Sequence, residues 1–123
     1  MVLGLGSDVI EIARIEASIT RFGGRFLERV FTPAEIAYCQ GKKQAAESFA
    51  ARFAAKEATM KALGVGLGSF RFAEVEVIRE ESGAPRLRTS GRAEPLAKEM
   101  GVRAFHVSLT HTGDIACAVV IAE

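Results

Sequence analysis

Apolar and polar positions near the start of the chain follow first the period of a strand and then that of a helix. The apolar run Val2–Leu5 predicts a strand that ends at Ser7-Asp8. From Ile12 to Phe22 the apolar side chains recur at helical spacing, which is typical of a helix with one buried face. Ser7 or Asp8 could cap this helix, because a side-chain oxygen there can accept from the first free N–H groups. We expect Gly23-Gly24 to interrupt it.

Two more helices are indicated by the residues at their ends. Thr32 can cap a helix in which Pro33 takes the first position and Glu35 closes a capping box, so we expect a short helix to about Cys39. The stretch 44–63 is rich in Ala, Glu and Lys, which are good helix formers, and Gly64 is a natural stop after it. Every fourth residue from 50 to 62 is alanine, and such a stripe lets another element approach closely.

The second half of the chain predicts mostly strands. Alternation over 103–110 and the almost wholly apolar run 115–122 predict two strands around a turn at 112–114, the second of them buried. A strand, a turn, a returning strand and a short helix are predicted before them at 70–78, 82–85, 86–89 and 92–100. No repeat, low-complexity tract or linker interrupts residues 1–123, so we expect a single domain.

Composition excludes several classes of protein. The chain has 16 Lys and Arg against 15 Asp and Glu, a balance that does not suggest a nucleic-acid binder. Cys39 and Cys117 build neither a disulfide framework nor a C-x-x-C site. No basic stretch precedes a long apolar one, and no run approaches the roughly 20 apolar residues of a membrane-spanning helix. We expect a soluble, cytoplasmic protein whose short chain favours an active site shared between subunits.

Glu57 and Lys61 are the first candidates for chemistry. They are four residues apart and therefore lie on one face of the predicted long helix. Such pairs are common on helix surfaces, where they add only about a few tenths of a kcal/mol. However, Phe53 and Phe49 lie on the same face, one and two turns earlier. A charge pair beside aromatic core residues is typical of the edge of a cleft.

Asp8 is the second candidate, either as a plain helix cap or as a metal ligand at the end of a strand. Mg²⁺ prefers one or two carboxylates, several waters and substrate phosphate oxygens. Asp8 and Glu57 would be enough carboxylate if the fold brought them together. Glu11 is a third carboxylate, which we expect to face solvent.

The predicted strand over 103–110 carries a polar row formed by His106, Ser108 and Thr110. This row could hold phosphate or hydroxyl groups, or it could be an exposed sheet face. No Cys, Asp or Glu cluster surrounds His106 or His111, which argues against zinc. A hydrolase pair of Ser108 and His111 is equally unsupported, because no G-x-S-x-G elbow is present.

A basic stripe with aromatic neighbours follows the first predicted helix. Its members are Arg14, Arg21, Arg25 and Arg29, with Phe22 and Phe26 beside them. Arginines with aromatic anchors suit the docking of an acidic helical partner. The alternative is a solvated basic face.

These segments together resemble the holo-acyl-carrier-protein synthase family of 4'-phosphopantetheinyl transferases over nearly the whole chain. The resemblance is carried by four stretches in order: 4–15 (GLGSDVIEIARI), 29–32 (RVFT) followed by Glu35, 52–58 (RFAAKEA) followed by Lys61-Ala62 and Gly64, and 106–111 (HVSLTH). The Gly83-Ala84-Pro85 turn also fits. The resemblance implies an α+β fold in which a small antiparallel sheet packs with a long helix and shorter helices.

The resemblance also implies an activity and an assembly. The enzyme would transfer the 4'-phosphopantetheine group of coenzyme A to a serine of apo-acyl carrier protein and release adenosine 3',5'-bisphosphate. The product would support fatty acid biosynthesis, with a polyketide carrier protein as the alternative. Short members of the family form trimers with active sites between subunits.

Residue roles follow from the same resemblance. Asp8 and Glu57 would hold Mg²⁺, Lys61 would lie near the same phosphates, and either Glu57 or a metal-bound water would take the serine proton. The residues implied for holding coenzyme A are Arg52, His106, Ser108, Gly64, Lys42, Lys43 and His111. The residues implied for docking the carrier protein are Arg14, Arg21, Phe22, Arg25 and Phe26.

Two rival functions remain at this level. Another Mg²⁺-dependent phosphate-transfer or pyrophosphate-cleaving enzyme would share Asp8, Glu57 and Lys61, but it would not need the basic stripe. A non-catalytic carrier-binding module would need the stripe and would tolerate loss of both carboxylates.

Overall fold

The computed structural model describes residues 1–123 and contains both helices and strands in an α+β arrangement, as expected. In chain order the elements are β1 (Gly4–Glu11), α1 (Ile12–Phe22), α2 (Gly24–Val30), α3 (Pro33–Gln40), α4 (Ala45–Leu63), the 3₁₀ helix η1 (Phe72–Glu74), β2 (Val75–Arg79), β3 (Pro85–Thr89), α5 (Ala93–Met100), β4 (Phe105–Thr112) and β5 (Ile115–Ala122).

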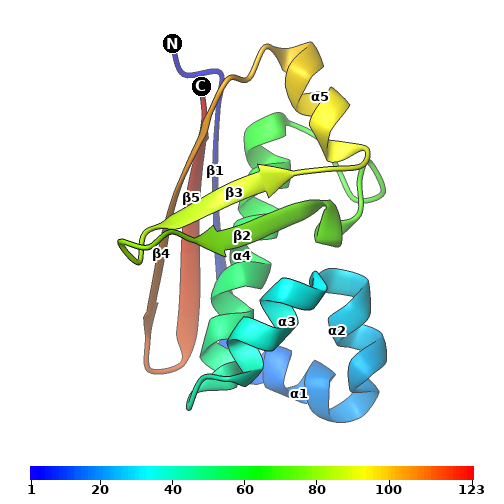
Figure 1. The fold of residues 1–123 in the computed structure, drawn as a ribbon, viewed down its shortest axis with the longest axis vertical. Coiled ribbons are helices and arrows are strands. Elements are labelled where there is room, and N and C mark those ends of the chain that lie inside the picture. The colour runs from blue at the N-terminus through cyan, green and yellow to red at the C-terminus, as the bar shows by residue number, and fades with distance from the viewer.

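Two antiparallel sheets frame the long helix α4. The larger has the strand order β1-β5-β4, and the smaller is the hairpin β2-β3. Figure 1 shows α4 running between the large sheet and this hairpin, with α1, α2 and α3 gathered at one end of the molecule and α5 at the other. The antiparallel sheet with a long helix and shorter helices is therefore confirmed.

Small side chains let α4 and β1 approach closely. The alanines at 50, 54, 58 and 62 are all buried, as the stripe predicts. On the strand side, a Cβ added at Gly6 would collide with the carbonyl oxygen of Ala58, and one at Gly4 with that of Ala62. Backbone therefore packs against backbone here, and only glycine fits on the strand.

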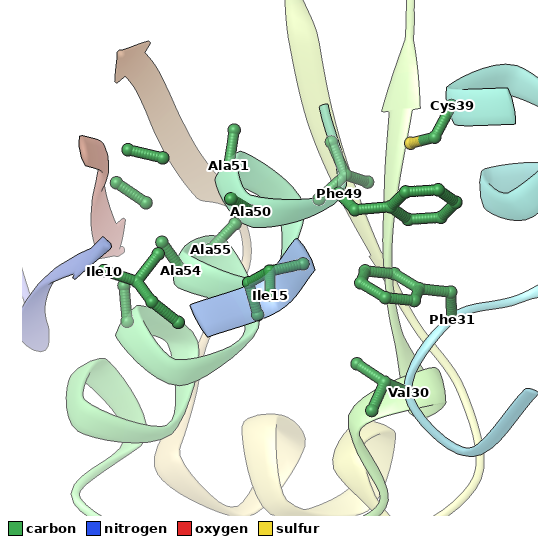
Figure 2. Packing of buried hydrophobic residues seen from close by; sticks show 14 of the residues in the cluster. Ile10, Ile15, Val30, Phe31, Cys39, Phe49, Ala50, Ala51, Ala54 and Ala55 are labelled. Atoms are coloured by element: carbon green, nitrogen blue, oxygen red, sulfur yellow. The ribbon is translucent and has the colours of Figure 1, made fainter. Parts of the chain in front are cut away.

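Larger apolar side chains fill the core where α3 and α4 meet. Figure 2 shows the rings of Phe31 and Phe49 facing each other beside Cys39. The two ring centroids are 4.9 Å apart. On the other side of α4, Ile10 and Ile15 lie against the helix (Figure 2). The core thus joins the large sheet to the helices at the lower end of Figure 1.

The first strand is longer than predicted. It runs through Ser7-Asp8 to Glu11, because the backbone pairs with β5 as far as Glu11 opposite Ile115. Helix α1 begins at Ile12, and no side chain caps it. The prediction that Ser7 or Asp8 caps this helix is therefore wrong. Glu11 is exposed, as expected.

Several local predictions are confirmed. Thr32 accepts from the backbone N–H of Glu35, and the Glu35 side chain accepts in return from the N–H of Thr32. Gly64 ends α4 with a φ of 68°, and Gly23, with a φ of 56°, separates α1 from α2. These residues act through local hydrogen bonding and backbone conformation, which nearby sequence predicts well.

Two strand predictions need correction. The predicted strand over 70–78 begins only at Val75, because Glu74 accepts from the backbone N–H groups of Arg71 and Arg92 and holds a 3₁₀ turn before it. The apolar strand β5 is buried on one face only. Its even-numbered residues pack inward, whereas Ile115 and Val119 remain exposed.

No helix of the structure has both the length and the apolar character that crossing a membrane requires.

Candidate active site

A pocket of about 200 Å³ lies where β1, α1, α2 and α4 meet. Asp8 and Glu57 both line it, although they are far apart in the sequence. Along β1 the side chains alternate, so Asp8 shares the helix-facing side with Gly6 and Ile10. The close approach at Gly6 brings this part of β1 against α4, which carries Glu57.

Lys61 completes the group one helical turn beyond Glu57. Its Nζ lies 3.3 Å from Asp8 Oδ1 and donates to the carbonyl oxygen of Ser7 at 2.9 Å. The Asp8 side chain is largely buried, whereas the Lys61 side chain is half exposed. Since an ion pair with an exposed member is weak, Lys61 is free to exchange Asp8 for another anion.

The electrostatics of the pocket favour a cation. Burial, followed by the negative charge and hydrogen bond of Asp8, raises the pKa of Glu57, while the charges of Lys61 and Arg14 oppose this rise. Two carboxyl groups that share a site repel each other when both are ionised. A bound divalent cation would remove this repulsion.

The donor set can be compared with what different metals require. No group of three or more His, Cys, Asp and Glu side chains that could hold a metal is present, so a zinc site of protein ligands alone is not formed. Two carboxylates at an open pocket fit Mg²⁺, which keeps several waters and takes phosphate oxygens as further ligands.

The candidates for holding coenzyme A lie away from this pocket within one chain. Arg52 is buried on another side of α4, with its guanidinium 4.4 Å from the centre of the Tyr38 ring. It lines a second pocket of about 230 Å³ with Arg79 and Arg88. Its Nε has no hydrogen-bond partner. Lys42 also lies over the Tyr38 ring.

The remaining candidates are dispersed. His106 Nε2 is 3.2 Å from Glu123 Oε1, and His111 Nδ1 is 3.7 Å from Glu47 Oε1. Ser108 is exposed on β4, and Gly64 follows α4. Lys43 lines a third pocket, between α1 and the start of α4.

Residues of the basic stripe and its aromatic neighbours border two adjacent hollows. Arg14 and Phe26 line the Asp8–Glu57 pocket itself. Phe22, Arg25, Phe26 and Arg29 border a neighbouring hollow of about 230 Å³. Phe22 is about half exposed, and the Arg21 guanidinium lies 5.1 Å from its ring centre. Phe26 therefore joins the basic surface to the carboxylate pocket.

Sequence reasoning missed Ser18 and Tyr38. Ser18 lines the Asp8–Glu57 pocket and stands four residues after Arg14, so helical spacing could have placed both on one face. Tyr38 meets Arg52 only through the packing of α3 on α4, which no local pattern reveals.

Comparison with known proteins gives a consistent result. Residues 4–120 match the family model of the 4'-phosphopantetheinyl transferase superfamily. A holo-[acyl-carrier-protein] synthase of Koribacter versatilis is 52% identical over 100% of this chain and 99% of its own length. The holo-[acyl-carrier-protein] synthase of Klebsiella pneumoniae is 47% identical over 99% of this chain and 98% of its own length.

Solved structures agree with this result. The holo-[acyl-carrier-protein] synthase of Neisseria meningitidis superposes with a TM-score of 0.92 at 30% identity, covering 100% of this chain and 99% of that one. The Helicobacter pylori enzyme in complex with coenzyme A superposes with a TM-score of 0.86 at 34% identity, covering 97% and 99%. The chain therefore belongs to the 4'-phosphopantetheinyl transferase superfamily.

Proposed function

We propose that this chain transfers the 4'-phosphopantetheine group of coenzyme A to a serine of apo-acyl carrier protein. The serine oxygen forms a bond to the β-phosphorus of coenzyme A and gives its proton to Glu57 or to a water beside it. The pyrophosphate P–O bond breaks, and adenosine 3',5'-bisphosphate leaves. The observation that carries the proposal is the convergence of Asp8, Glu57 and Lys61 in a pocket that adjoins a basic, aromatic surface. The relatives named holo-[acyl-carrier-protein] synthase support it.

Asp8 and Glu57 would hold Mg²⁺, which when bound would neutralise charge on the pyrophosphate. Lys61 would leave its contact with Asp8 and place its ammonium beside the departing phosphate. Because its side chain is half exposed, it can reach outward from the pocket. The chain needs no nucleophile of its own, since the carrier protein supplies the serine.

We further propose a homotrimer with active sites between subunits. The outer face of the large sheet is unpartnered and carries exposed apolar residues, namely Leu5, Val9, Ile115 and Val119. An exposed apolar patch on a sheet is typical of a protein interface. In the strand register Ser108 lies opposite Val119, and His106 lies opposite Ile121, so both candidates belong to this face. A neighbouring subunit would therefore meet His106 and Ser108.

This assembly would bring together residues that one chain keeps apart. Arg52, His106 and Ser108 are the first candidates for coenzyme A, and Gly64, Lys42, Lys43 and His111 the further ones. None of them lines the pocket of Asp8 and Glu57 within one chain. Contributions from two subunits to one site would resolve this separation.

The carrier protein would dock on the first two helices. Arg14, Arg21 and Arg25 supply positive charge for an acidic helix, and Phe22 and Phe26 supply apolar anchors. Arg14 and Phe26 also border the carboxylate pocket, so a docked carrier would present its serine there.

A cytoplasmic location and a role in fatty acid biosynthesis complete the proposal. Two free cysteines suit a reducing compartment.

The test is the intact mass of a purified apo-acyl carrier protein after incubation with this protein, coenzyme A and Mg²⁺. We expect one mass increase, equal to a phosphopantetheine group, that a chelator abolishes. Cleavage of coenzyme A without carrier modification would instead favour another pyrophosphate-cleaving enzyme. Carrier binding that survives Asp8→Ala and Glu57→Ala, with no mass shift in any variant, would favour a non-catalytic module.

A further inference from the structure

Lys56 stands next to Glu57 in α4, yet its side chain is wholly buried. The ammonium donates to Glu35 Oε1 at 2.7 Å, to the carbonyl oxygen of Val75 at 2.6 Å and to that of Phe72 at 3.1 Å. A lysine ammonium has three N–H donors, so each one has a partner. A cation held in this way does not reach substrate, and its role is different from that of Lys61.

The carboxylate of Glu35 is equally occupied. Besides Lys56, its Oε1 accepts from the backbone N–H of Thr32 at 3.0 Å, and its Oε2 accepts from that of Val77 at 2.9 Å. One ion pair thus ties α3, α4 and the η1–β2 segment together. Buried ion pairs add little net stability compared with apolar residues of the same volume. Their directional hydrogen bonds supply a defined geometry instead.

This polar network adjoins the wall of the carboxylate pocket. Phe72, whose carbonyl Lys56 holds, packs its ring against Phe53 with the centroids 5.4 Å apart. Phe53 lines the pocket together with Glu57. On its other side α4 rests on β1 mainly through alanines, whose apolar contacts are non-directional, and through the half-exposed Lys61, which donates to the carbonyl oxygen of Ser7. The fully buried, directional bonds of Lys56 are therefore well suited to fix how α4 is rotated about its axis.

We propose that Lys56 is a positioning residue, which together with Glu35 holds α4 in the rotation that points Glu57 at Asp8 and keeps Phe53 in the pocket wall. The inference rests on the proposed function, in which Glu57 is a metal ligand. Residues 56 and 57 are about 100° apart around the helix. If the bonds of Lys56 were lost and α4 rotated, Glu57 would therefore be displaced. A displacement of about 1 Å at a reacting centre can cost a hundredfold in rate.

The experiment compares variants that remove the pair with one that weakens the fold elsewhere. Lys56→Met alone leaves the buried charge of Glu35 unpaired and is expected to unfold in part. The double variant Lys56→Met/Glu35→Gln removes both charges, and Glu35→Gln alone is the milder second variant. Ala97→Gly, in α5, is the control. All are studied where circular dichroism shows them folded.

Two readouts separate positioning from stability: Mn²⁺ affinity by electron paramagnetic resonance, and kcat and KM for the carrier protein. We expect the double variant to lose about tenfold or more in Mn²⁺ affinity and in kcat, as partners of metal ligands typically do. The KM for the carrier should stay within about twofold, because the docking surface is not involved. Glu35→Gln should show smaller losses, and Ala97→Gly none.

A folded double variant or Glu35→Gln that binds Mn²⁺ and turns over like Ala97→Gly would overturn the inference. If the unaltered protein binds Mn²⁺ but modifies no carrier, the proposed transfer fails while the Mn²⁺ comparison still decides the role of Lys56. If the unaltered protein binds no Mn²⁺, both the metal site and the positioning role are wrong.

Discussion

The direction in which a side chain points decides whether that residue can line the carboxylate pocket. Asp8 and Val9 are neighbours on β1, but the Asp8 side chain is largely buried, whereas Val9 is exposed on the outer face of the sheet. Lys56 and Glu57 are neighbours on α4, and only Glu57 reaches the pocket. The periods of strand and helix therefore select which of two adjacent side chains can take part in chemistry.

Glu57→Gln should fold normally and lose activity. The substitution changes shape little, but it removes one of the two negative charges that we propose hold Mg²⁺. We expect transfer to fall by about a hundredfold, at the upper end of losses around metal sites. Intact-mass assays at limiting Mg²⁺ measure this, and near-normal turnover there would remove Glu57 from the metal site.

Arg14→Ala should mainly raise the KM for the carrier protein, because it removes a cation from the proposed docking surface. We expect an increase of about tenfold, which corresponds to roughly 1.4 kcal/mol. Arg103→Ala, outside the docking surface, is a matched control. Steady-state kinetics at low and high salt measure both, and an unchanged KM for Arg14→Ala excludes it from docking.

Cys39 should resist alkylation in the folded protein. Burial raises the pKa of its thiol to about 11, so at pH 8.5 the reactive thiolate is scarce as well as inaccessible. Iodoacetamide should modify Cys39 only in denaturant, as mass spectrometry of peptides can show. Rapid modification of Cys39 without denaturant would contradict the packing of α3 on α4.

At the scale of elements, the contact of β1 with α4 brings the two carboxylates together. The contact depends on glycine in the strand and alanine in the helix, because a larger residue on either element would push the two backbones apart. The Lys56–Glu35 pair then joins the same helix to α3 and β2. Helix α4 is thus held from two sides, with the pocket between β1 and the first helices.

Gly6→Ala tests this contact. The added methyl group would meet the carbonyl oxygen of Ala58, so strand and helix must move apart. We expect a loss of about 1–3 kcal/mol in the free energy of unfolding, as is usual for overpacking. Gly66→Ala is the control, since nothing lies within 4 Å of its added Cβ. Urea denaturation measures the free energy of unfolding of both variants. Equal stability of Gly6→Ala and Gly66→Ala would contradict the close approach of β1 to α4.

At the scale of the whole molecule, one face of the large sheet is covered by α4 while the other carries exposed apolar side chains. We expect Val119→Glu to convert a trimer into monomers, because it buries a charge in the proposed interface. Leu67→Glu, at an exposed site outside the sheet, should leave the trimer intact. Light scattering after size-exclusion chromatography measures this. A monomeric unaltered protein would refute the proposed assembly.

The sequence by itself determined the local features of this protein. The capping box at Thr32, the stops at Gly23 and Gly64 and the alanine stripe are all present as predicted. Their causes are hydrogen bonds and backbone preferences within a few residues. The motifs also indicated the family correctly. They pointed to Asp8, Glu57 and Lys61, which the structure brings close together and whose roles stay a prediction.

Only the tertiary structure decided which distant residues meet. The extension of β1 past Asp8 depends on pairing with β5, at the far end of the chain. Lys56 looks like any helix-surface lysine in sequence, yet it is buried because Glu35 and two backbone carbonyls surround it. The helical period already places Arg52 and Glu57 about 140° apart around α4. The tertiary structure decides what each then meets, which is Tyr38 of α3 for Arg52 and the pocket with Asp8 for Glu57. Long-range packing sets these contacts, and no local pattern encodes it.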